Sequence, residues 1–600
     1  MIRYTISPQH PAAHLFEVTI TVADPNPTGQ RFMLPTWIPG SYMIREFSRH
    51  ITTLAATCNG GAVEVHKIDK CTWQCAPVEG ALTLTYTVYA WDLSVRAAHL
   101  DDTHGFFNGT SVFLLAEGFR ASPCEVDIRR PSGARYADWK IATALKCGSS
   151  TKNFGTFHAD NYDELIDHPV EMGKFTHAQF DACGITHHVV LTGRHRADVA
   201  RLCADLQKIC EAQIRLFEPE SALAPMKEYW FLFMVVGEGF GGLEHRASTS
   251  LIVSRDELPQ ANEPRMTVPY RKLLSLASHE YFHTWNVKRI MPARFVPYDL
   301  ATENYTTQLW FFEGFTDYYD DLMLVRSGVI TPLEYLEIEA DGIGRVMAQA
   351  GRAKQSVAQS SFDAWIKYYR QDENAVNSMV SYYQKGALVA LALDLTIRNA
   401  TSDHKSLDDV MRSLWQRYGK TGIGVPEGEV ERTANDVSGS DLSGFFADTV
   451  YGTKDLALDK LLATAGIVLS WRATAASATP ATASKVAERT PPTLGAKIGG
   501  DTNGDAKLLQ VFDGGAALAA GLSAGDTIVA LDGLRVNAAS LERKIKAYDI
   551  GSVVELVAFR RDEMMHVTLT LSEAANKTCV LTLNENPPEA KTRRSNWLGG

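Results

Sequence analysis

The chain has 600 residues, of which 45% are hydrophobic and 22% are charged, and its net charge is −11 at pH 7. This length is too great for one core and predicts about three to five domains, and the composition is that of a globular protein. The acidic balance and the lack of a basic tract argue against a nucleic-acid partner, and no run of about 18 apolar residues predicts a membrane span.

The N-terminal segment, residues 1–8, reads as a strand and has none of the apolar core that a secretory signal needs. Nine cysteines, an odd number, are scattered along the chain. This pattern fits a reducing compartment better than a disulfide scaffold. We therefore expect a cytoplasmic protein, or a periplasmic one if a leader has been removed.

Residues 1–165 predict an N-terminal β-rich, sandwich-like domain. Residues 15–22 and 82–90 alternate apolar and polar side chains, as half-buried strands do, and clusters of Pro, Gly and Asn separate the strands. An aromatic-rich turn, Trp-Ile-Pro-Gly-Ser-Tyr, occupies residues 37–42. Its composition is compatible with a place in the core or at the rim of the domain.

The pattern changes near residue 166. Residues 194–215 predict an amphipathic helix, and the continuous apolar run 228–236 predicts a buried strand. A Gly-rich bend follows, in which Gly241 and Gly242 allow the backbone of a ligand to approach closely. Glu244 in this bend could face a positively charged group of a substrate, or it could be a solvated loop acid.

The strongest chemical signal is His279-Glu280-Tyr281-Phe282-His283, within the helix-like run 273–287. Residues four apart lie on one face of a helix, so both imidazoles can point at one ion. Glu280 follows the first histidine, where its carboxylate can act as a base on the attacking water. This is the pattern of zinc hydrolases. The alternative is a helix that carries two surface histidines.

A three-ligand zinc site needs one more side chain, and Glu313 lies 30 positions after His283 in a second apolar, helix-like segment. A lone acid among aromatic residues is costly to bury unless it is paired or binds a metal. Its alternative role is an ordinary buried ion pair. Asp317, one helical turn later, could orient His279 through its second nitrogen, or it could be a solvated helix acid.

Downstream, Tyr383 and its neighbour Tyr382 open a long apolar helix that extends to about residue 397. A tyrosine hydroxyl at this place could donate to a developing oxyanion, and a packed core tyrosine is the alternative. Helical patterns continue to about residue 451. Residues 166–455 therefore predict a mainly α domain with the candidate zinc site.

The last part of the chain predicts three further segments. Residues 456–493 read as a connector and a low-complexity linker rich in Ala, Thr, Ser and Pro. Residues 494–575 predict a small β-rich module with one short helix. Residues 576–600 read as a polar tail.

Taken together, these motifs resemble known proteins. The zinc signature with its downstream Glu-Gly-x-Thr-x-Tyr-Tyr segment is similar to the gluzincin metallopeptidases. The Gly-Gly-Leu-Glu-His bend is similar to the exopeptidase loop of aminopeptidase N-like enzymes, with Leu for Met and His for Asn. Tyr383-Gln384-Lys385-Gly386 is similar to their transition-state tyrosine segment. The Ala-Gly-Leu-x-x-Gly-Asp-x-Ile motif resembles a PDZ domain. The combination resembles the glycyl aminopeptidase family over nearly the whole chain.

The resemblance implies a multidomain α+β protein. It would have an N-terminal β-sandwich-like domain, a thermolysin-like, mainly α catalytic domain and a C-terminal PDZ-like β domain. The resemblance also assigns roles to residues. One zinc ion per chain is held by His279, His283 and Glu313, with Glu280 as general base, Tyr383 at the oxyanion and Glu244 on the free α-ammonium of the substrate.

The expected function is therefore a zinc aminopeptidase that removes small N-terminal residues, Gly and Ala, from peptides. One alternative is a zinc endopeptidase that uses the same metal site and does not need Glu244. The other is a non-catalytic scaffold with a peptide-binding module. The expected partners are peptides with a free N-terminus. The loop at residues 494–497 could also dock a peptide C-terminus by strand addition, or the module could be a structural appendage packed on the catalytic core.

Overall fold

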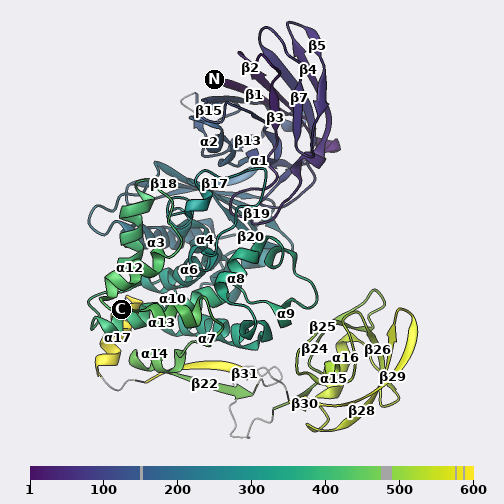
Figure 1. Cartoon of the computed structure of the whole chain (residues 1–600), viewed down its shortest axis with the longest axis vertical. Helices are drawn as coiled ribbons and strands as arrows, with labels where there is room; N and C mark the ends of the chain where they lie inside the picture. The colour runs from purple at the N-terminus through teal and green to yellow at the C-terminus, as the bar shows by residue number, and fades with distance from the viewer. Residues whose placement is uncertain (149–152, 474–489, 574–576, 585–587, 600) are drawn as a thin grey trace. The chain divides into compact units, whose positions relative to one another are not determined.

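We describe the protein from a computed structural model, which describes residues 1–148, 153–473, 490–573, 577–584 and 588–599. Helices and strands carry the labels of Figure 1. The chain divides into two compact units. Unit 1 comprises Met1–Tyr305, Tyr319–Ile330 and Val410–Glu429, and unit 2 comprises Thr306–Tyr318, Thr331–Asp409 and Val430–Gly600.

The N-terminal part of unit 1 is β-rich, as the sequence predicts. Its largest sheet has eight strands in the order β14-β15-β12-β1-β2-β8-β4-β5, drawn mostly in purple in Figure 1. The strands are β14 (Lys146–Cys147), β15 (Gly155–Ala159), β12 (Cys124–Ile128), β1 (Ile2–His10), β2 (Leu15–Val22), β8 (Leu82–Tyr89), β4 (Ile51–Cys58) and β5 (Gly61–Val63). In β2 every second side chain is fully buried, from Phe16 to Val22. This is the period of a strand with one face on the core.

Two four-stranded sheets complete this domain, in the orders β13-β16-β10-β9 and β11-β3-β7-β6. The first contains β13 (Lys140–Ala142), β16 (Val170–Gly173), β10 (His104–Phe107) and β9 (Ala98–Leu100). The second contains β11 (Leu115–Ala116), β3 (Arg31–Met33), β7 (Thr72–Cys75) and β6 (Val65–Lys67). One apolar core joins side chains from all three sheets.

The rest of unit 1 is built on a five-stranded sheet of order β17-β18-β19-β21-β20. The strands are β17 (Phe175–Ala182), β18 (Ile185–Thr192), β19 (Glu228–Val236), β21 (Ser248–Ser254) and β20 (Phe240–Glu244). The central strands β18, β19 and β21 run parallel, and β20 pairs antiparallel with β21 at the edge. Two helices, α3 (Val199–Phe217) and α4 (Val268–Phe282), pack against this sheet and each other. The expected helix at 194–215 and strand at 228–236 are therefore present.

Unit 2 is mainly helical before its C-terminal module. Its helices include α5 (Leu309–Phe312), α7 (Pro332–Ala348), α8 (Val357–Phe362), α9 (Ala375–Ser378), α10 (Gln384–Ala400), α13 (Ser443–Thr449) and α14 (Leu458–Thr464). Helix α10 is buried along almost its whole length and packs against α5, α7 and α14. The apolar run that the sequence shows after Tyr383 is therefore the central helix of this unit.

The C-terminal module has a core of its own, formed by residues between Leu494 and Leu571. Its sheet has the order β24-β25-β26-β28-β29, with β27 paired to β26. The strands are β24 (Ala496–Gly500), β25 (Ala506–Val511), β26 (Thr527–Leu531), β27 (Leu534–Arg535), β28 (Val553–Arg560) and β29 (Glu563–Thr570), and the helices are α15 (Ala516–Ala519) and α16 (Ala538–Ile545). These residues form a β-rich fold with two short helices, where the sequence analysis expects one.

This module is an insertion within one antiparallel strand pair. Strand β22 (Ile467–Ala473) precedes it and β31 (Lys577–Leu583) follows it, and the two strands pair from Ile467↔Leu583 to Ala473↔Lys577. Helix α17 (Pro588–Leu598) then returns to α14, with Trp597 fully buried. The segment expected as a polar tail thus forms a strand and a helix. Of the expected connector and linker at 456–493, residues 474–489 lie outside the described residues, and α14 and β22 form the part before them.

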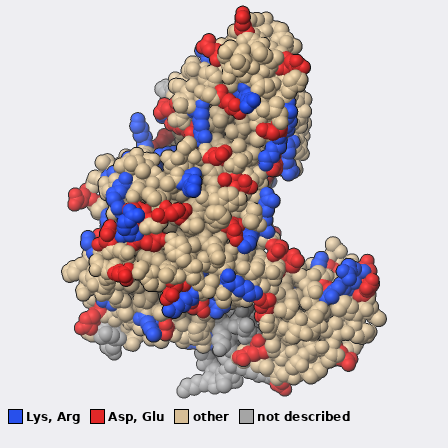
Figure 2. Space-filling view, in the orientation of Figure 1, with Lys and Arg blue, Asp and Glu red and all other residues tan. Residues whose placement is uncertain are grey.

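Three further observations concern the described residues as a set. Among the described residues, no helix combines the length and the apolar character needed to cross a bilayer. All nine cysteines are free thiols. Figure 2 shows Lys and Arg interspersed with Asp and Glu over the face in view.

Candidate functional site

The two histidines of the candidate metal site lie at the C-terminal end of helix α4 in unit 1. Thr267 caps the start of this helix by accepting a hydrogen bond from the backbone N–H of Tyr270 at 3.2 Å, and Pro269 lies in its first turn. His279 is in the last turn and His283 is the C-cap. Their ring centroids are 4.6 Å apart. The helical spacing therefore places both imidazoles on one face.

The orientation of each ring is fixed through its Nδ1 atom. Nδ1 of His279 donates to the carboxylate of Asp320 at 2.9 Å, and Nδ1 of His283 donates to the backbone oxygen of Asn286 at 2.7 Å. Both acceptors lack a proton to give, so each ring carries a proton on Nδ1, and in its neutral form it leaves Nε2 available to a metal. This is the arrangement that metal-binding histidines use.

Asp320 makes a hydrogen bond to Nδ1 of His279, which is the role that the sequence analysis expects of Asp317. Asp320 lies on helix α6 (Gly314–Arg326) and is 3% exposed. Asp317 and Asp320 are about one helical turn apart. The sequence alone does not distinguish them, because three acids follow Glu313 on this helix. Only the packing of α6 against α4 decides which of them reaches the imidazole.

Two carboxylates lie beside His283 within unit 1. Glu280 on α4, Glu244 at the end of β20 and His283 each offer one atom, and these three atoms lie within 4.8 Å of one another. Glu244 is 4% exposed and Glu280 is 5% exposed. Oε1 of Glu244 is buried and has no hydrogen-bond partner among the described residues. A buried acceptor without a donor is costly, so this oxygen marks a place for a cationic group.

Glycines make room for these two carboxylates. A Cβ atom on Gly242 would overlap with Oε1 of Glu280, whereas a Cβ on Gly241 would meet nothing within 4 Å. A Cβ on Gly40 would overlap with both carboxylate oxygens of Glu244. Gly40 belongs to the aromatic-rich turn of the N-terminal domain. This turn therefore closes over the bend that carries Glu244, which composition did not reveal.

A buried ion pair supports the same bend. Nζ of Lys288 lies 2.6 Å from a carboxylate oxygen of Asp167, and His245, which follows Glu244, faces the same carboxylate at 3.8 Å. Burial alone would lower the pKa of Lys288, but the negative charges of Asp167 and Glu244 raise it above its ordinary value. Lys288 is therefore a permanent cation near Glu244. No motif marked Lys288 or Asp167 in the sequence.

Glu313 and Tyr383 are brought together within unit 2. Glu313 follows the last residue of α5, is 2% exposed, and precedes Gly314. Tyr383 caps the start of α10, two residues after Ser381 and three before Gly386. A Cβ on Gly314 would lie 2.5 Å from Cα of Gly386. These two glycines thus allow the α5 end and the α10 start to touch, which places the acid and the phenol in one environment.

The phenol of Tyr383 remains protonated at neutral pH. Burial raises its pKa well above the ordinary value, and the negative charge of Glu313 raises it further. Its hydroxyl lies 3.3 Å from that of Tyr369. The rival residue, Tyr382, is completely buried, whereas Tyr383 is partly exposed. The partial exposure favours Tyr383 as the residue that can meet a substrate.

Comparisons with known proteins found two matching family models and a similar solved structure. The family model of the peptidase M61 N-terminal domain matches residues 3–174 of the sequence, and the family model of the M61 glycyl aminopeptidase matches residues 272–389. A crystal structure of an aminopeptidase N family protein from Idiomarina loihiensis is 44% identical, covers 100% of both chains and has a TM-score of 0.93.

More distant structures are also similar. An M1 zinc metallopeptidase from Deinococcus radiodurans has 15% identity, 76% coverage of this chain, 94% coverage of its own chain and a TM-score of 0.47. A variant of that enzyme, bound to a Tyr-Ser-Ala substrate, has 14% identity with the same coverage and TM-score. No curated protein sequence matches the chain.

Proposed function

The chain belongs to the M61 glycyl aminopeptidase family, whose members are metallopeptidases, and from this premise we propose that it is a zinc aminopeptidase that removes glycine and alanine from the N-termini of peptides. The observation that carries the proposal is the buried cluster of Glu244, Glu280 and His283. It combines a metal-ligating imidazole, a base and an acceptor for a cation within a few ångströms.

We propose that His279, His283 and Glu313 hold the zinc ion. The donor set fits: two imidazoles with proton-bearing, hydrogen-bonded Nδ1 atoms and one buried carboxylate are the ligands of a catalytic zinc with an open position. When bound, zinc supplies a Lewis acid that polarises the scissile carbonyl and lowers the pKa of water.

The residues of this chain would divide the remaining chemistry. Glu280 accepts a proton from the attacking water and then gives it to the amine that leaves. Tyr383 keeps its proton and donates a hydrogen bond to the oxygen that becomes negative in the transition state. Glu244 binds the α-ammonium of the substrate, because its buried Oε1 otherwise lacks a donor among the described residues.

The preference for small residues is proposed from the surroundings of Glu244. Gly40 lies so close that no side chain fits between its Cα atom and the carboxylate, and Glu244 itself is almost fully buried. Trp37, in the same turn, donates from its indole N–H to the backbone oxygen of Asp299 at 2.7 Å, which fixes the turn in place. A rigid backbone this close to the carboxylate that binds the amine leaves little room for a large side chain on the N-terminal residue of the peptide.

A matched pair of peptides tests the proposal. The pair is a glycyl peptide with a free amine and its N-acetylated form, each incubated with and without a zinc chelator. We expect cleavage of the free peptide alone, lost with the chelator and restored by Zn²⁺. Cleavage of both peptides would replace the aminopeptidase with an endopeptidase. Cleavage of neither, with zinc bound, would favour a scaffold without catalysis.

The size preference needs its own series. Peptides that differ only in the first residue (Gly, Ala, Leu and Phe) should give kcat/KM values that fall as this residue grows. An equal or higher value for Leu than for Ala would exclude the proposed preference and leave the aminopeptidase activity standing.

We further propose that the C-terminal module is PDZ-like and binds the C-terminus of a peptide. Strand β24 lies at the edge of its sheet beside α16, and Gly495, with φ of +70°, precedes β24 in the turn that would receive a carboxylate. A labelled peptide with a free carboxylate should bind the full chain at least tenfold more tightly than the same peptide with an amidated C-terminus. Equal binding of the two would argue for a structural appendage.

A further inference from the structure

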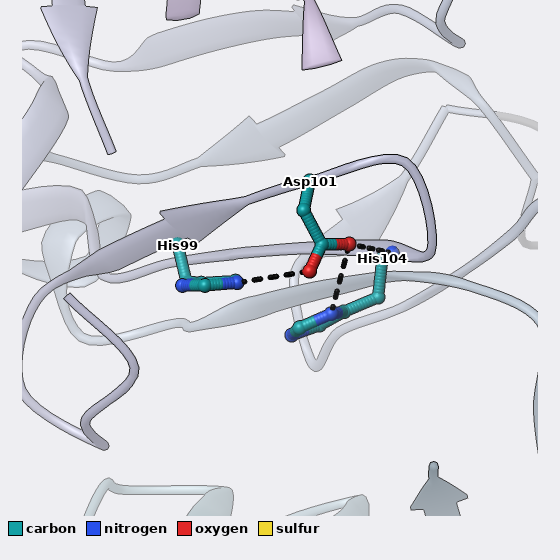
Figure 3. Close-up of side chains that lie close together, drawn as sticks. All are labelled: His99, Asp101 and His104. Carbon is teal, nitrogen blue, oxygen red and sulfur yellow. Dashed lines mark hydrogen bonds and ion pairs between the residues drawn. The ribbon is translucent and has the colours of Figure 1, made fainter. Parts of the chain in front are cut away.

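A second cluster of metal-ligating side chains lies in the N-terminal domain, far along the chain from the zinc signature. His99 is in β9, His104 begins β10, and Asp101 lies in the turn that joins these two strands. The hairpin register pairs Leu100 with Gly105, so the turn is short and holds all three residues close together. Figure 3 shows both imidazole rings directed at the carboxylate of Asp101.

The distances in this cluster suit the ligands of one ion better than they suit hydrogen bonds. Nε2 of His99 is 3.3 Å from Oδ2 of Asp101, and Nδ1 of His104 is 3.7 Å from Oδ1 of the same carboxylate. A charge-assisted hydrogen bond is about 2.7–2.9 Å long. Two ligands of a tetrahedral zinc with bonds of about 2.0–2.1 Å lie roughly 3.3–3.5 Å apart. One ligand atom from each residue lies within 4.8 Å of the other two.

The two oxygens of Asp101 have different tasks. Oδ1 accepts hydrogen bonds from the backbone N–H groups of Thr103 and His104 at 2.6 and 3.0 Å, and from the Thr103 hydroxyl at 2.6 Å. It therefore holds the turn. Oδ2 faces His99. The side chain of Asp101 is 28% exposed, so the cluster is not sealed from solvent.

The rings are held in place before any ion arrives. His99 is stacked between Trp91 and His104, with ring centroids 4.8 and 4.9 Å away. His99 is 5% exposed and His104 is 3% exposed. This stack reduces the freedom of both imidazoles, so ion binding would cost little side-chain entropy.

The outer nitrogen of His104 supplies an independent observation. Nε2 of His104 and Oε1 of Glu171 are both buried and have no hydrogen-bond partner among the described residues. Both side chains line the same small cavity, and Glu171 is only 4% exposed. A histidine that binds a metal through Nδ1 carries its proton on Nε2 and gives it to a carboxylate or carbonyl. Glu171 is placed to be that acceptor.

We propose that His99, Asp101 and His104 form a second divalent-metal site, with Glu171 as the acceptor for His104. Two imidazoles and one carboxylate select zinc and similar transition-metal ions over Mg²⁺ and Ca²⁺, which prefer oxygen ligands. The site has no role in the proposed peptide hydrolysis and does not depend on that proposal. Its purpose is structural, because it fastens the hairpin β9–β10 in which all three ligands lie.

The test counts metal ions on the full chain. The protein is stripped with a chelator and dialysed against Zn²⁺ or Co²⁺ in the presence of excess Mg²⁺, and bound metal is measured per chain. We expect two ions on the unaltered chain, one on Asp101→Asn and one on the double variant His279→Ala, His283→Ala. Combining all three substitutions should leave none. One ion on the unaltered chain, or two on Asp101→Asn, would overturn the proposal.

Three variants guard against a loss of fold. Asp101→Asn keeps the Oδ1 acceptor of the turn, and its metal-free melting temperature should match that of the unaltered chain. His104→Gln should also bind one ion, which gives a second route to the same result. His66→Gln changes an exposed histidine of the same domain, with a side chain 66% exposed, and should still bind two.

Glu171→Gln should weaken zinc binding at this site by about 10–100-fold, and unchanged binding would remove Glu171 from the proposal.

Discussion

At the scale of single residues, the candidate site depends on carboxylates whose positions are set by glycines and by hydrogen bonds. Glu280 fits against Gly242, Glu244 fits against Gly40, and Asp320 orients His279. Each of these contacts can be removed separately. They therefore allow the roles of base, amine acceptor and orienting acid to be tested one at a time.

The first prediction concerns Glu280. Glu280→Gln keeps the size of the side chain and removes its basicity, so it should leave bound zinc unchanged and lower kcat by about 10²–10⁴-fold, the usual contribution of a general base. The measurement is kcat on a glycyl peptide together with zinc content by elemental analysis. A variant that retains near-native kcat would show that another group accepts the proton.

The second prediction separates Asp320 from Asp317. Asp320→Asn loses the charged acceptor of the His279 Nδ1–H and should weaken zinc binding by about 10–100-fold in a competition with a chromophoric chelator. Asp317→Asn is the matched control, one turn away on the same helix, and should change zinc affinity less than threefold. If the larger loss came from Asp317→Asn, the orienting role would belong to Asp317.

The third prediction concerns Gly40. A methyl group there overlaps with the carboxylate of Glu244, so Gly40→Ala should raise KM for free-amine peptides at least tenfold. Gly40 has φ of +96°, so the change also costs about 1 kcal/mol of stability from backbone strain. Gly118→Ala is the control, because Gly118 has φ of +86° and open space around its Cα. It should lose stability and keep its KM.

At the scale of elements, unit 2 is organised by the contact between the start of α10 and the junction of α5 with α6. Gly386 and Gly314 meet at this contact. Small residues on both sides let the backbones approach closely, as a Cβ on either would collide with the other. The contact fixes the relative position of Glu313 and Tyr383, since each lies within three residues of one of the glycines.

The fourth prediction follows from this contact. Gly386→Ala places a Cβ 2.7 Å from the backbone oxygen of Trp310 and should destabilise the chain by about 1–3 kcal/mol, as overpacking does. Gly444→Ala is the control, because Gly444 lies in α13 and its added methyl group would have no neighbouring atom within 4 Å. It should be neutral or stabilising, as alanine favours a helix. Chemical denaturation of both variants measures the difference, and equal stabilities would contradict the packing argument.

At the scale of the whole molecule, the C-terminal module interrupts a strand pair of unit 2 rather than ending the chain. Strands β22 and β31 pair directly, and α17 carries Trp597, whose indole N–H donates to the Tyr318 hydroxyl at 2.8 Å. Tyr318 in turn donates to Asp394 on α10 at 2.7 Å. The last residues therefore stabilise the helices that carry the candidate site.

The fifth prediction tests this insertion. Ala473 and Lys577 are paired, so replacing residues 474–576 with Asn-Gly closes a two-residue hairpin. The shortened chain should remain folded and cleave short glycyl peptides with kcat/KM within about fivefold of the full chain. Ending the chain at Ala473 is the comparison, and it should unfold because it loses β31 and Trp597. A folded, active chain ending at Ala473 would show that the C-terminal segment is dispensable.

Much of the architecture could be predicted from the sequence, because it depends on local periodicity. Alternation in residues 15–22 predicts β2, and the apolar run 228–236 predicts β19. The tail was not predicted as folded. Its polar composition conceals one large side chain, Trp597, whose partner Tyr318 is 279 positions away.

By itself, the sequence determined the pair His279 and His283, the adjacent Glu280 and the resemblance to the family, since a helix of fixed pitch places residues four apart on one face. Only the tertiary structure decided that Asp320 orients His279, that Gly40 covers Glu244 and that Lys288 lies near it. These contacts join residues separated by tens to hundreds of positions. Such contacts arise from the packing of whole elements, which no local pattern encodes.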